Sequence, residues 1–474
     1  MFIVMVVVFV LGYLAIALEH PLRVDKAIPA LAIGSLMWVL YIFGAYDIFT
    51  AGLSEAWNSF SGGDHGHGHG EQGIEAMRHF IVHNEIIHHL GEISEILFFL
   101  LGAMTIVEVI DKHDGFKIIT DRIKTLKKVK LLWILSVLTF FMSAALDNLT
   151  TTIVMVALLR KLIAEKETRW FFASMIVLAA NAGGAWSPIG DVTTIMLWIG
   201  GQVSTGSIIA NVIVPSLFTM VVPLALLSIT QKGTVSRPEV DANEKIYTTP
   251  FERKLFLIMG VCGLLFVPVF KTVTHLPPYM GMLLSLSIIW LVSEILHKDK
   301  PEEVKKRLKV IYILQKVDTP TIFFFLGILS AVAAMQSAGQ LAVLATWLDA
   351  NLGNIYLIDL AIGVLSAIVD NVPLVAGAMG MYPIEDAASI AAMTDPAAIE
   401  YAANFVQDGL FWEFLAYCAG TGGSILIIGS AAGVAAMGME KIDFIWYLKR
   451  ISLLALLGYV AGAAVYYLQV QIIG

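Results

Sequence analysis

The sequence predicts an all-α membrane protein with many transmembrane helices, and two observations support this prediction. Of its 474 residues, 58% are hydrophobic and only 14% are charged, with a mean hydropathy of +0.80. A chain of this composition lacks the polar residues needed to cover a water-soluble protein. Apolar runs of about 20 residues also recur, which is the length that a helix needs to cross ~30 Å of hydrocarbon.

The apolar runs define the expected elements in chain order. We predict helices over 2–18, 27–44, 93–110, 170–200, 208–229, 255–274, 279–297, 319–336, 410–439 and 448–470, and two hairpins over 131–159 and 354–381. The chain starts Met-Phe-Ile-Val without a basic segment or a small-residue cleavage site, so we expect the first run to be a membrane span rather than a cleaved signal peptide.

The distribution of cations assigns sides to the loops. Lys and Arg cluster in a few segments, including 112–130 and 160–169, whereas 317–440 contains neither residue. By the positive-inside rule, the basic segments face the cytoplasm and the loops of 317–440 face outward. Hairpin 131–159 is flanked by two cytoplasmic segments and should enter and return from the inside. Hairpin 354–381 should enter from the outside.

An Asp-Asn pair stands at the expected tip of each hairpin. The first is Asp147-Asn148, four residues after Ser143, and the second is Asp370-Asn371, four residues after Ser366. Carboxylates within membrane-length apolar segments are costly, and they usually mark an ion pathway. The two pairs therefore predict a transport site.

Two further motifs repeat in the same order. Phe98-Phe99-Leu-Leu-Gly102 and Phe324-Phe325-Leu-Gly327 precede the hairpins, and a Gly-Gly pair seven residues before a Gly follows each hairpin. Hairpins entering from opposite sides make the repeats inverted, a plan of secondary transporters. We expect N-terminal spans, an outer His-rich loop and an amphipathic helix in 1–92, the first repeat in 93–229, central scaffold spans in 230–318 and the second repeat in 319–474.

The Gly-rich segments of 170–200 and 410–439 should interrupt their helices near the bilayer centre, where only a protein or water cavity can satisfy free backbone groups. Asp191 could cap the second half of the first broken helix, and Ser430 has the equivalent place in the second. The predicted ion-binding and proton-carrying residues are Asp147, Asn148, Asn181, Asp191, Thr193, Asp370, Asn371, Ser424 and Ser430.

These side chains offer hard oxygen donors and no basic group, which suits Na⁺, Li⁺ or protons. Na⁺ is expected at Asp147, Asp191 and Asp370. In our hypothesis, the site crosses the membrane only when a cation or protons neutralise its charge.

These motifs resemble those of NhaD-type Na⁺/H⁺ antiporters of the ion transporter superfamily. The resemblance rests on Asp147-Asn148-Leu-Thr-Thr, on Asp370-Asn371-Val-Pro and on the two Gly-rich segments with Asp191 and Ser430. It implies Na⁺ and Li⁺ exchange for H⁺, pH homeostasis, a bacterial inner membrane, and the nine site residues given above. It also implies a homodimer with the inverted-repeat fold, two re-entrant hairpins and an elevator-like transport domain.

The residues alone leave other functions open. A Na⁺-coupled dicarboxylate carrier or an arsenite-type efflux permease would use the same hairpins. His65, His67 and His69 could gather a divalent metal, although a flexible Gly-rich loop explains them more simply. No nucleophile with a partner base stands out, and we expect no enzyme activity, no cofactor and no nucleic-acid partner.

Overall fold

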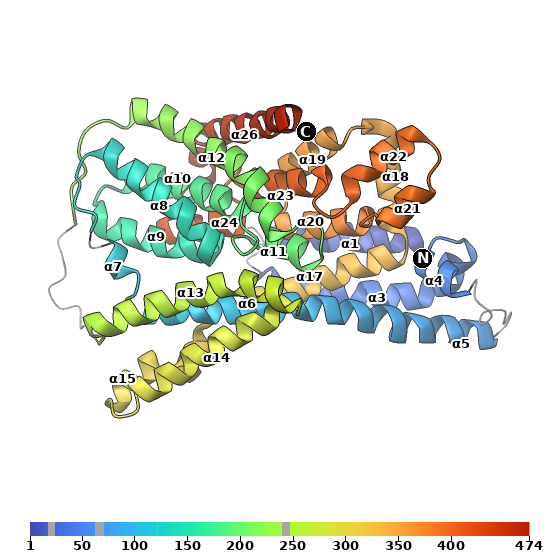
Figure 1. Ribbon diagram of the computed structural model, residues 1–474, viewed down its shortest axis with the longest axis horizontal. Helices are drawn as coiled ribbons and strands as arrows, with labels where there is room; N and C mark the ends of the chain where they lie inside the picture. Colours follow the sequence, from blue (N-terminus) through green and yellow to red (C-terminus); the bar gives the residue numbers. More distant parts are fainter. Residues whose placement is uncertain (18–23, 62–70, 121, 239–246, 474) are drawn as a thin grey trace. The chain divides into compact units, whose positions relative to one another are not determined.

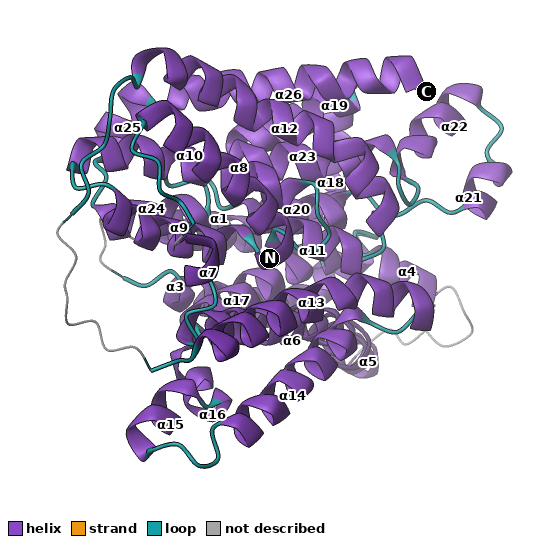
Figure 2. Ribbon diagram, turned by 60° about the vertical axis from the view of Figure 1, so that its left-hand side comes forward, coloured by secondary structure: helices purple, strands orange, loops and turns teal. Residues whose placement is uncertain are grey.

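The computed structural model describes residues 1–17, 24–61, 71–120, 122–238 and 247–473, and regular structure within these ranges is helical (Figure 2). Lys127 and Thr234 form an isolated bridge. The structure therefore confirms the predicted all-α class. His65, His67 and His69 lie outside the described residues.

The chain forms two compact units. The first contains Met1–Leu100, Asp318–Asn354 and Pro373–Pro383, and the second contains Leu101–Val317, Ile355–Val372 and Ile384–Gly474. A boundary between the units falls at Val317 and Asp318, next to the predicted boundary at 318, whereas none falls at 92 or 229. The predicted division into repeats stays a prediction.

Ten of the described helices have ten residues or more and lie outside the predicted hairpins and broken helices (Figure 1). They are α1 (Phe2–Ala17), α3 (Ala27–Thr50), α5 (Glu71–Phe80), α6 (Ile87–Lys112), α12 (Thr205–Thr230), α13 (Pro250–Thr274), α14 (Pro278–Leu296), α17 (Thr319–Ser337), α18 (Gln340–Leu352) and α26 (Ser452–Ile473). Eight of the predicted spans correspond to single helices, which are α1, α3, α6, α12, α13, α14, α17 and α26. In the described part of the chain, eight helices are long and apolar enough to cross a membrane. The set includes the helix Lys128–Leu146 of the first predicted hairpin, whereas α1 is a shorter apolar helix.

The first unit is built on close contact between α3 and α17. A Cβ on Gly34 would lie 2.5 Å from the Gly327 carbonyl oxygen, so the two backbones touch where neither residue has a side chain. The predicted amphipathic segment and the span 93–110 form one continuous helix, with a π-helical turn at Ile81–Ile86. Within that turn Glu85 is buried and accepts a hydrogen bond from the Tyr41 hydroxyl at 3.3 Å.

The second unit contains the first predicted hairpin as two helices, α8 (Lys128–Leu146) and α9 (Asn148–Leu162). The Lys128 ammonium lies 3.4 Å from the Glu165 carboxylate and donates to the Thr168 hydroxyl at 3.1 Å. The two outer ends of the hairpin therefore meet, which requires the chain to turn back at Asp147. The side from which this hairpin enters the membrane stays a prediction.

The other site-forming elements of the second unit are interrupted helices, as predicted. The first comprises α10 (Lys166–Ala185) and α11 (Val192–Ile199), and the second comprises α23 (Leu410–Gly422) and α24 (Ala431–Glu440). In the second predicted hairpin, α19 (Ile355–Leu365) ends before Asp370, and α20 (Asn371–Met381) begins directly after it and belongs to the first unit from Pro373 onward.

Equivalent contacts join each hairpin to its broken helix. The Ser143 hydroxyl donates to the Ala180 carbonyl at 2.5 Å, and the Ser366 hydroxyl donates to the Ala419 carbonyl at 3.1 Å. Both serines stand four residues before the Asp of their hairpin. The same side-chain-to-backbone bond is therefore made in both sequence repeats.

Each broken helix also contacts an arm of its hairpin through a glycine. A Cβ on Gly183 would lie 2.2 Å from the Phe140 carbonyl oxygen, and one on Gly422 would lie 1.9 Å from the Gly363 carbonyl oxygen. Only glycine allows this approach between the broken helices and the hairpin arms.

Gly422→Ala should therefore destabilise the protein by roughly 1–3 kcal/mol, because the added methyl group overlaps a backbone carbonyl that cannot move aside. Gly206→Ala is the matched control, because a Cβ at this helical position meets nothing within 4 Å. Thermal unfolding of the purified protein in detergent measures the difference. Equal midpoints for the two variants would contradict the proposed contact.

A buried histidine pair lies beyond the ends of two membrane-length helices. His113 follows α6 and stacks on Phe256 with ring centroids 3.6 Å apart, and its ring lies 5.1 Å from that of His297, which follows α14. Both imidazoles donate from Nδ1 to a backbone carbonyl one turn earlier, each at 2.7 Å. Burial lowers the pKa of His113 from 6.5 to about 4, against the opposing effect of its bond to Val109.

This histidine should make the fold less stable in acid. Between pH 6.5 and about 4 the unfolded chain binds a proton at His113 that the folded protein does not, so stability falls as pH falls, at about 1.4 kcal/mol per pH unit. His113→Asn should flatten the loss of thermal stability between pH 8 and pH 5, and the exposed His275→Asn should not. An unchanged slope in His113→Asn would contradict this assignment.

Candidate functional site

Asp147 forms the tip of the first hairpin in a strained conformation. Its backbone has φ 83° and ψ 157°, a region occupied almost only by glycine. Its half-buried carboxylate accepts hydrogen bonds from the Thr150 backbone N–H and hydroxyl, both at 2.8 Å, and so caps α9. The cap holds the carboxyl group at the break between α8 and α9.

Asp191 ends the interruption of the first broken helix. It caps α11 as predicted, because its Oδ1 accepts from the Thr193 backbone N–H and hydroxyl, both at 2.9 Å. The residue is 1% exposed. A carboxylate is thereby fixed at a helix N-terminus inside the second unit, where the helix dipole favours negative charge.

The asparagines of both hairpin tips donate to the Asp191 carboxylate. Asn148 donates from Nδ2 to Oδ2 of Asp191. Asn371 donates from Nδ2 to the same carboxylate, 3.3 Å from Oδ1 and 3.4 Å from Oδ2. Asp191 is therefore the point at which the two Asp-Asn motifs meet.

Asn181 extends this network to the second broken helix. Its Oδ1 accepts from Asn148 at 3.0 Å, and its Nδ2 donates to the hydroxyls of Ser424 and Ser430, both at 2.9 Å. Ser430 also caps α24, as predicted, by accepting from the Gly433 N–H at 3.1 Å. One hydrogen-bonded network thus joins both hairpin tips and both broken helices.

The structure brings seven of the nine predicted residues into this network: Asn148, Asn181, Asp191, Thr193, Asn371, Ser424 and Ser430. Asp147 bonds to Thr150, and Asp370 accepts from the Val372 backbone N–H at 3.4 Å. Each of these two carboxylates directly precedes an asparagine that donates to Asp191.

Among the described residues, no three His, Cys, Asp or Glu side chains are placed to hold a metal ion together. A cation at Asp191 would therefore take its remaining ligands from amide and hydroxyl oxygens. The network contains no basic side chain, so its charge is that of its carboxylates.

The sequence analysis assigned no role to the threonines that follow Asn148 and Leu149. Thr150 fixes Asp147, and its neighbours Thr151 and Thr152 are fully buried, with side-chain hydroxyls that have no hydrogen-bond partner among the described residues. Three consecutive threonines directly after the first Asp-Asn-Leu are the signal that could have identified them.

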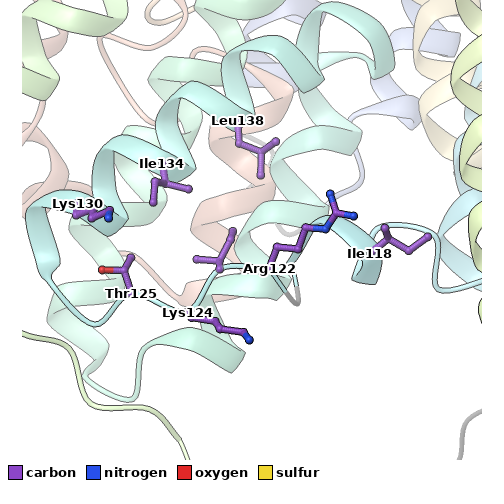
Figure 3. A pocket seen from close by; sticks show the side chains of 8 residues that line it. Ile118, Arg122, Lys124, Thr125, Lys130, Ile134 and Leu138 are labelled. Atoms are coloured by element: carbon purple, nitrogen blue, oxygen red, sulfur yellow. The ribbon is translucent and has the colours of Figure 1, made fainter.

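A separate basic pocket of about 510 Å³ lies at the start of α8 (Figure 3). Its lining comprises Ile118, Arg122, Ile123, Lys124, Thr125, Lys130, Ile134 and Leu138. None of these residues belongs to the Asp191 network, so the pocket is not part of the candidate site.

The strain at Asp147 can be measured by comparing Asp147→Ala with Asp147→Gly. Both variants lose the cap on α9, but only alanine keeps a side chain in the unfavourable backbone region, which costs of order 1–3 kcal/mol. Glycine loses about 0.5–1 kcal/mol through its greater freedom when unfolded. The glycine variant should be the more stable by roughly 1 kcal/mol in thermal unfolding; a more stable alanine variant would show that the backbone is relaxed.

Comparison with known proteins finds one matching family and several relatives. Residues 13–404 match the family described as citrate transporter. Sodium/proton antiporter 1 of Arabidopsis thaliana is 44% identical over 98% of this chain and 72% of its own length, and sodium/proton antiporter 2 of the same plant is 42% identical over 98% of both. The Na(+)/H(+) antiporter NhaD of Vibrio cholerae is 27% identical over 97% of this chain and 90% of its own length.

Proposed function

Because this chain belongs to the citrate transporter family, with NhaD-type sodium/proton antiporters among its relatives, we propose that it exchanges Na⁺ for H⁺ across a membrane. It is a multi-pass membrane protein, as its apolar helices indicate. The observation that carries the proposal is the buried carboxylate of Asp191, which accepts hydrogen bonds from both Asn148 and Asn371.

A buried carboxylate in apolar surroundings needs a positive partner or a proton. The network around Asp191 supplies amide and hydroxyl donors but no cation of its own. Na⁺ and H⁺ therefore compete for the same group, and each can neutralise it only when the other has left. Exchange follows if the site changes sides only in the neutralised state.

The chemistry of the donors sets the ion class. Asp191 offers carboxylate oxygens, Asn181 an amide oxygen, and Ser424 and Ser430 hydroxyl oxygens, all hard ligands suited to small alkali cations. Li⁺ should therefore replace Na⁺. The two asparagines at the hairpin tips would exchange their contacts with Asp191 for contacts to the ion.

The resemblance to NhaD-type antiporters also suggests further features, which we add to the proposal. They are alternating access of the elevator type, a homodimeric assembly, a bacterial inner membrane and a role in pH homeostasis. The antiporters similar to this chain come from bacteria and from a plant.

A Na⁺-coupled carboxylate carrier is the alternative that the family description itself favours. A citrate or dicarboxylate anion would have to bind beside Asp191, Asp147 and Asp370. Because no described residue of the Asp191 network is basic, such a substrate would be repelled unless bound Na⁺ ions supplied all of the positive charge. A transport assay with arsenite distinguishes an arsenite-type permease from a Na⁺/H⁺ exchanger.

In proteoliposomes, an inward Na⁺ or Li⁺ gradient should drive proton efflux, whereas K⁺, arsenite and citrate should not. Asp191→Asn should lower this activity at least tenfold, about 1.4 kcal/mol or more in transition-state terms, because the competing group can no longer release a proton. Asp147→Asn and Asp370→Asn should also impair it. The exposed Glu167→Gln, on the same helix as Asn181, is the control.

Full Na⁺-driven proton movement in Asp191→Asn would overturn the proposed site. Citrate or arsenite uptake by the wild-type protein, without Na⁺-driven proton movement, would overturn the proposed function.

A further inference from the structure

One buried carboxyl group has no part in the Asp191 network. Asp359 lies on α19, the first arm of the second hairpin, and it is fully buried. Among the residues that the structure describes, neither of its carboxylate oxygens has a hydrogen-bond partner.

Other buried carboxylates of the second unit are satisfied. Glu440 accepts from Arg160 and Arg169, both at 2.8 Å. Glu413, on α23, accepts from Asn211 at 2.8 Å and from Tyr466 at 3.1 Å. Asp359 therefore differs from Glu440 and Glu413, because neither of its carboxylate oxygens has a hydrogen-bond partner among the described residues.

The titratable groups that face Asp359 are neutral. They are Tyr356 on its own helix, Cys418 on α23, and Tyr459 and Tyr466 on α26. The Tyr459 hydroxyl is already used, because it donates to the Leu360 carbonyl at 3.1 Å. No described basic side chain acts on Asp359.

A bare carboxylate in such a place loses its hydration without gaining a partner, and such groups take up a proton instead. A carboxylic acid, in contrast, is neutral and can remain buried. The geometry therefore requires Asp359 to be in the protonated form in the conformation described here.

The internal repeat gives this position a counterpart. Ser136 stands eleven residues before Asp147, as Asp359 stands eleven residues before Asp370. Ser136 is 1% exposed, and its hydroxyl also lacks a hydrogen-bond partner among the described residues. Both hairpin arms thus keep a polar residue at the same place, but only the second arm has one that can carry a proton.

We propose that Asp359 is a second proton-binding residue of the transport cycle, which holds a proton while the Asp191 site is free of Na⁺ and releases it when Na⁺ binds. This inference rests on the proposed function. The step converts the Asp359 carboxylic acid to a carboxylate and one H⁺, which leaves to water. Each Na⁺ is then exchanged for one proton more than the Asp191 site alone would release.

The hairpin arm provides the coupling between the two positions. Asp359 lies on α19, which ends at Leu365, and Asp370 follows only five residues after Leu365. Asn371, directly after Asp370, donates to the Asp191 carboxylate. When Na⁺ takes the place of that contact, the arm that carries Asp359 shifts with the tip, and the new surroundings of Asp359 favour release of its proton.

The test is the number of protons exchanged per Na⁺, measured in proteoliposomes as the Na⁺ gradient that just balances an imposed pH gradient and membrane potential. Asp359→Asn should exchange one proton fewer per Na⁺ than the wild type. Asp359→Ser, which installs the residue of the first repeat, should behave in the same way and serves if the asparagine variant does not fold. Glu413→Gln should keep the wild-type ratio.

Infrared difference spectroscopy gives a readout that does not require turnover. Addition of Na⁺ to the wild-type protein should remove a carbonyl stretch of a protonated carboxyl group, and this loss should be absent from Asp359→Asn and Asp359→Ser. This infrared signal tests the role of Asp359 even if both variants fold but no longer transport Na⁺.

An unchanged proton ratio in the folded, active variants would overturn the inference and leave the proposed exchange intact. An infrared band of Asp359 that persists when Na⁺ is added would also overturn it. If the wild-type protein itself fails to exchange Na⁺ for H⁺, the proposed function fails first, and the two failures are thereby distinguished.

Discussion

The structure of the second unit depends on one interaction, the binding of the Asp191 carboxylate by the asparagines of two different hairpin tips. Asn148 and Asn371 come from separate repeats, yet both donate to the same group. Because Asp191 is also fixed by the Thr193 cap, the two tips are held relative to the start of α11. A change in the charge of this one carboxylate therefore acts on both hairpins at once.

Close packing between backbones allows that arrangement. Gly183 and Gly422 bring the broken helices against the hairpin arms, and serine hydroxyls bond across the same contacts in both repeats. The unfavourable backbone of Asp147 is stabilised by its cap on α9. Strain at this point is consistent with a group that must change its contacts during a cycle, since strained residues gather at functional sites.

The two repeats are alike in their packing and different in their chemistry. Ser143 and Ser366 make equivalent bonds, whereas Asp191 is matched by Ser430 and Ser136 by Asp359. The first repeat supplies the ionisable group at the centre, and the second supplies one along its hairpin arm. Equivalent packing in the two sequence repeats thus carries an unequal set of ionisable groups.

The sequence by itself predicted the membrane-length helices, the two breaks and the seven residues that the structure joins in one network, because spans need a minimum apolar length and a buried Asp-Asn pair is costly in apolar surroundings. It also identified Asp191 and Ser430 as caps. Only the tertiary structure showed that Asp191, rather than Asp147 or Asp370, receives both asparagines, since this depends on which helices approach closely. The sequence also could not show that Asp359 lacks a hydrogen-bond partner among the described residues, because its neighbours in space are distant in sequence.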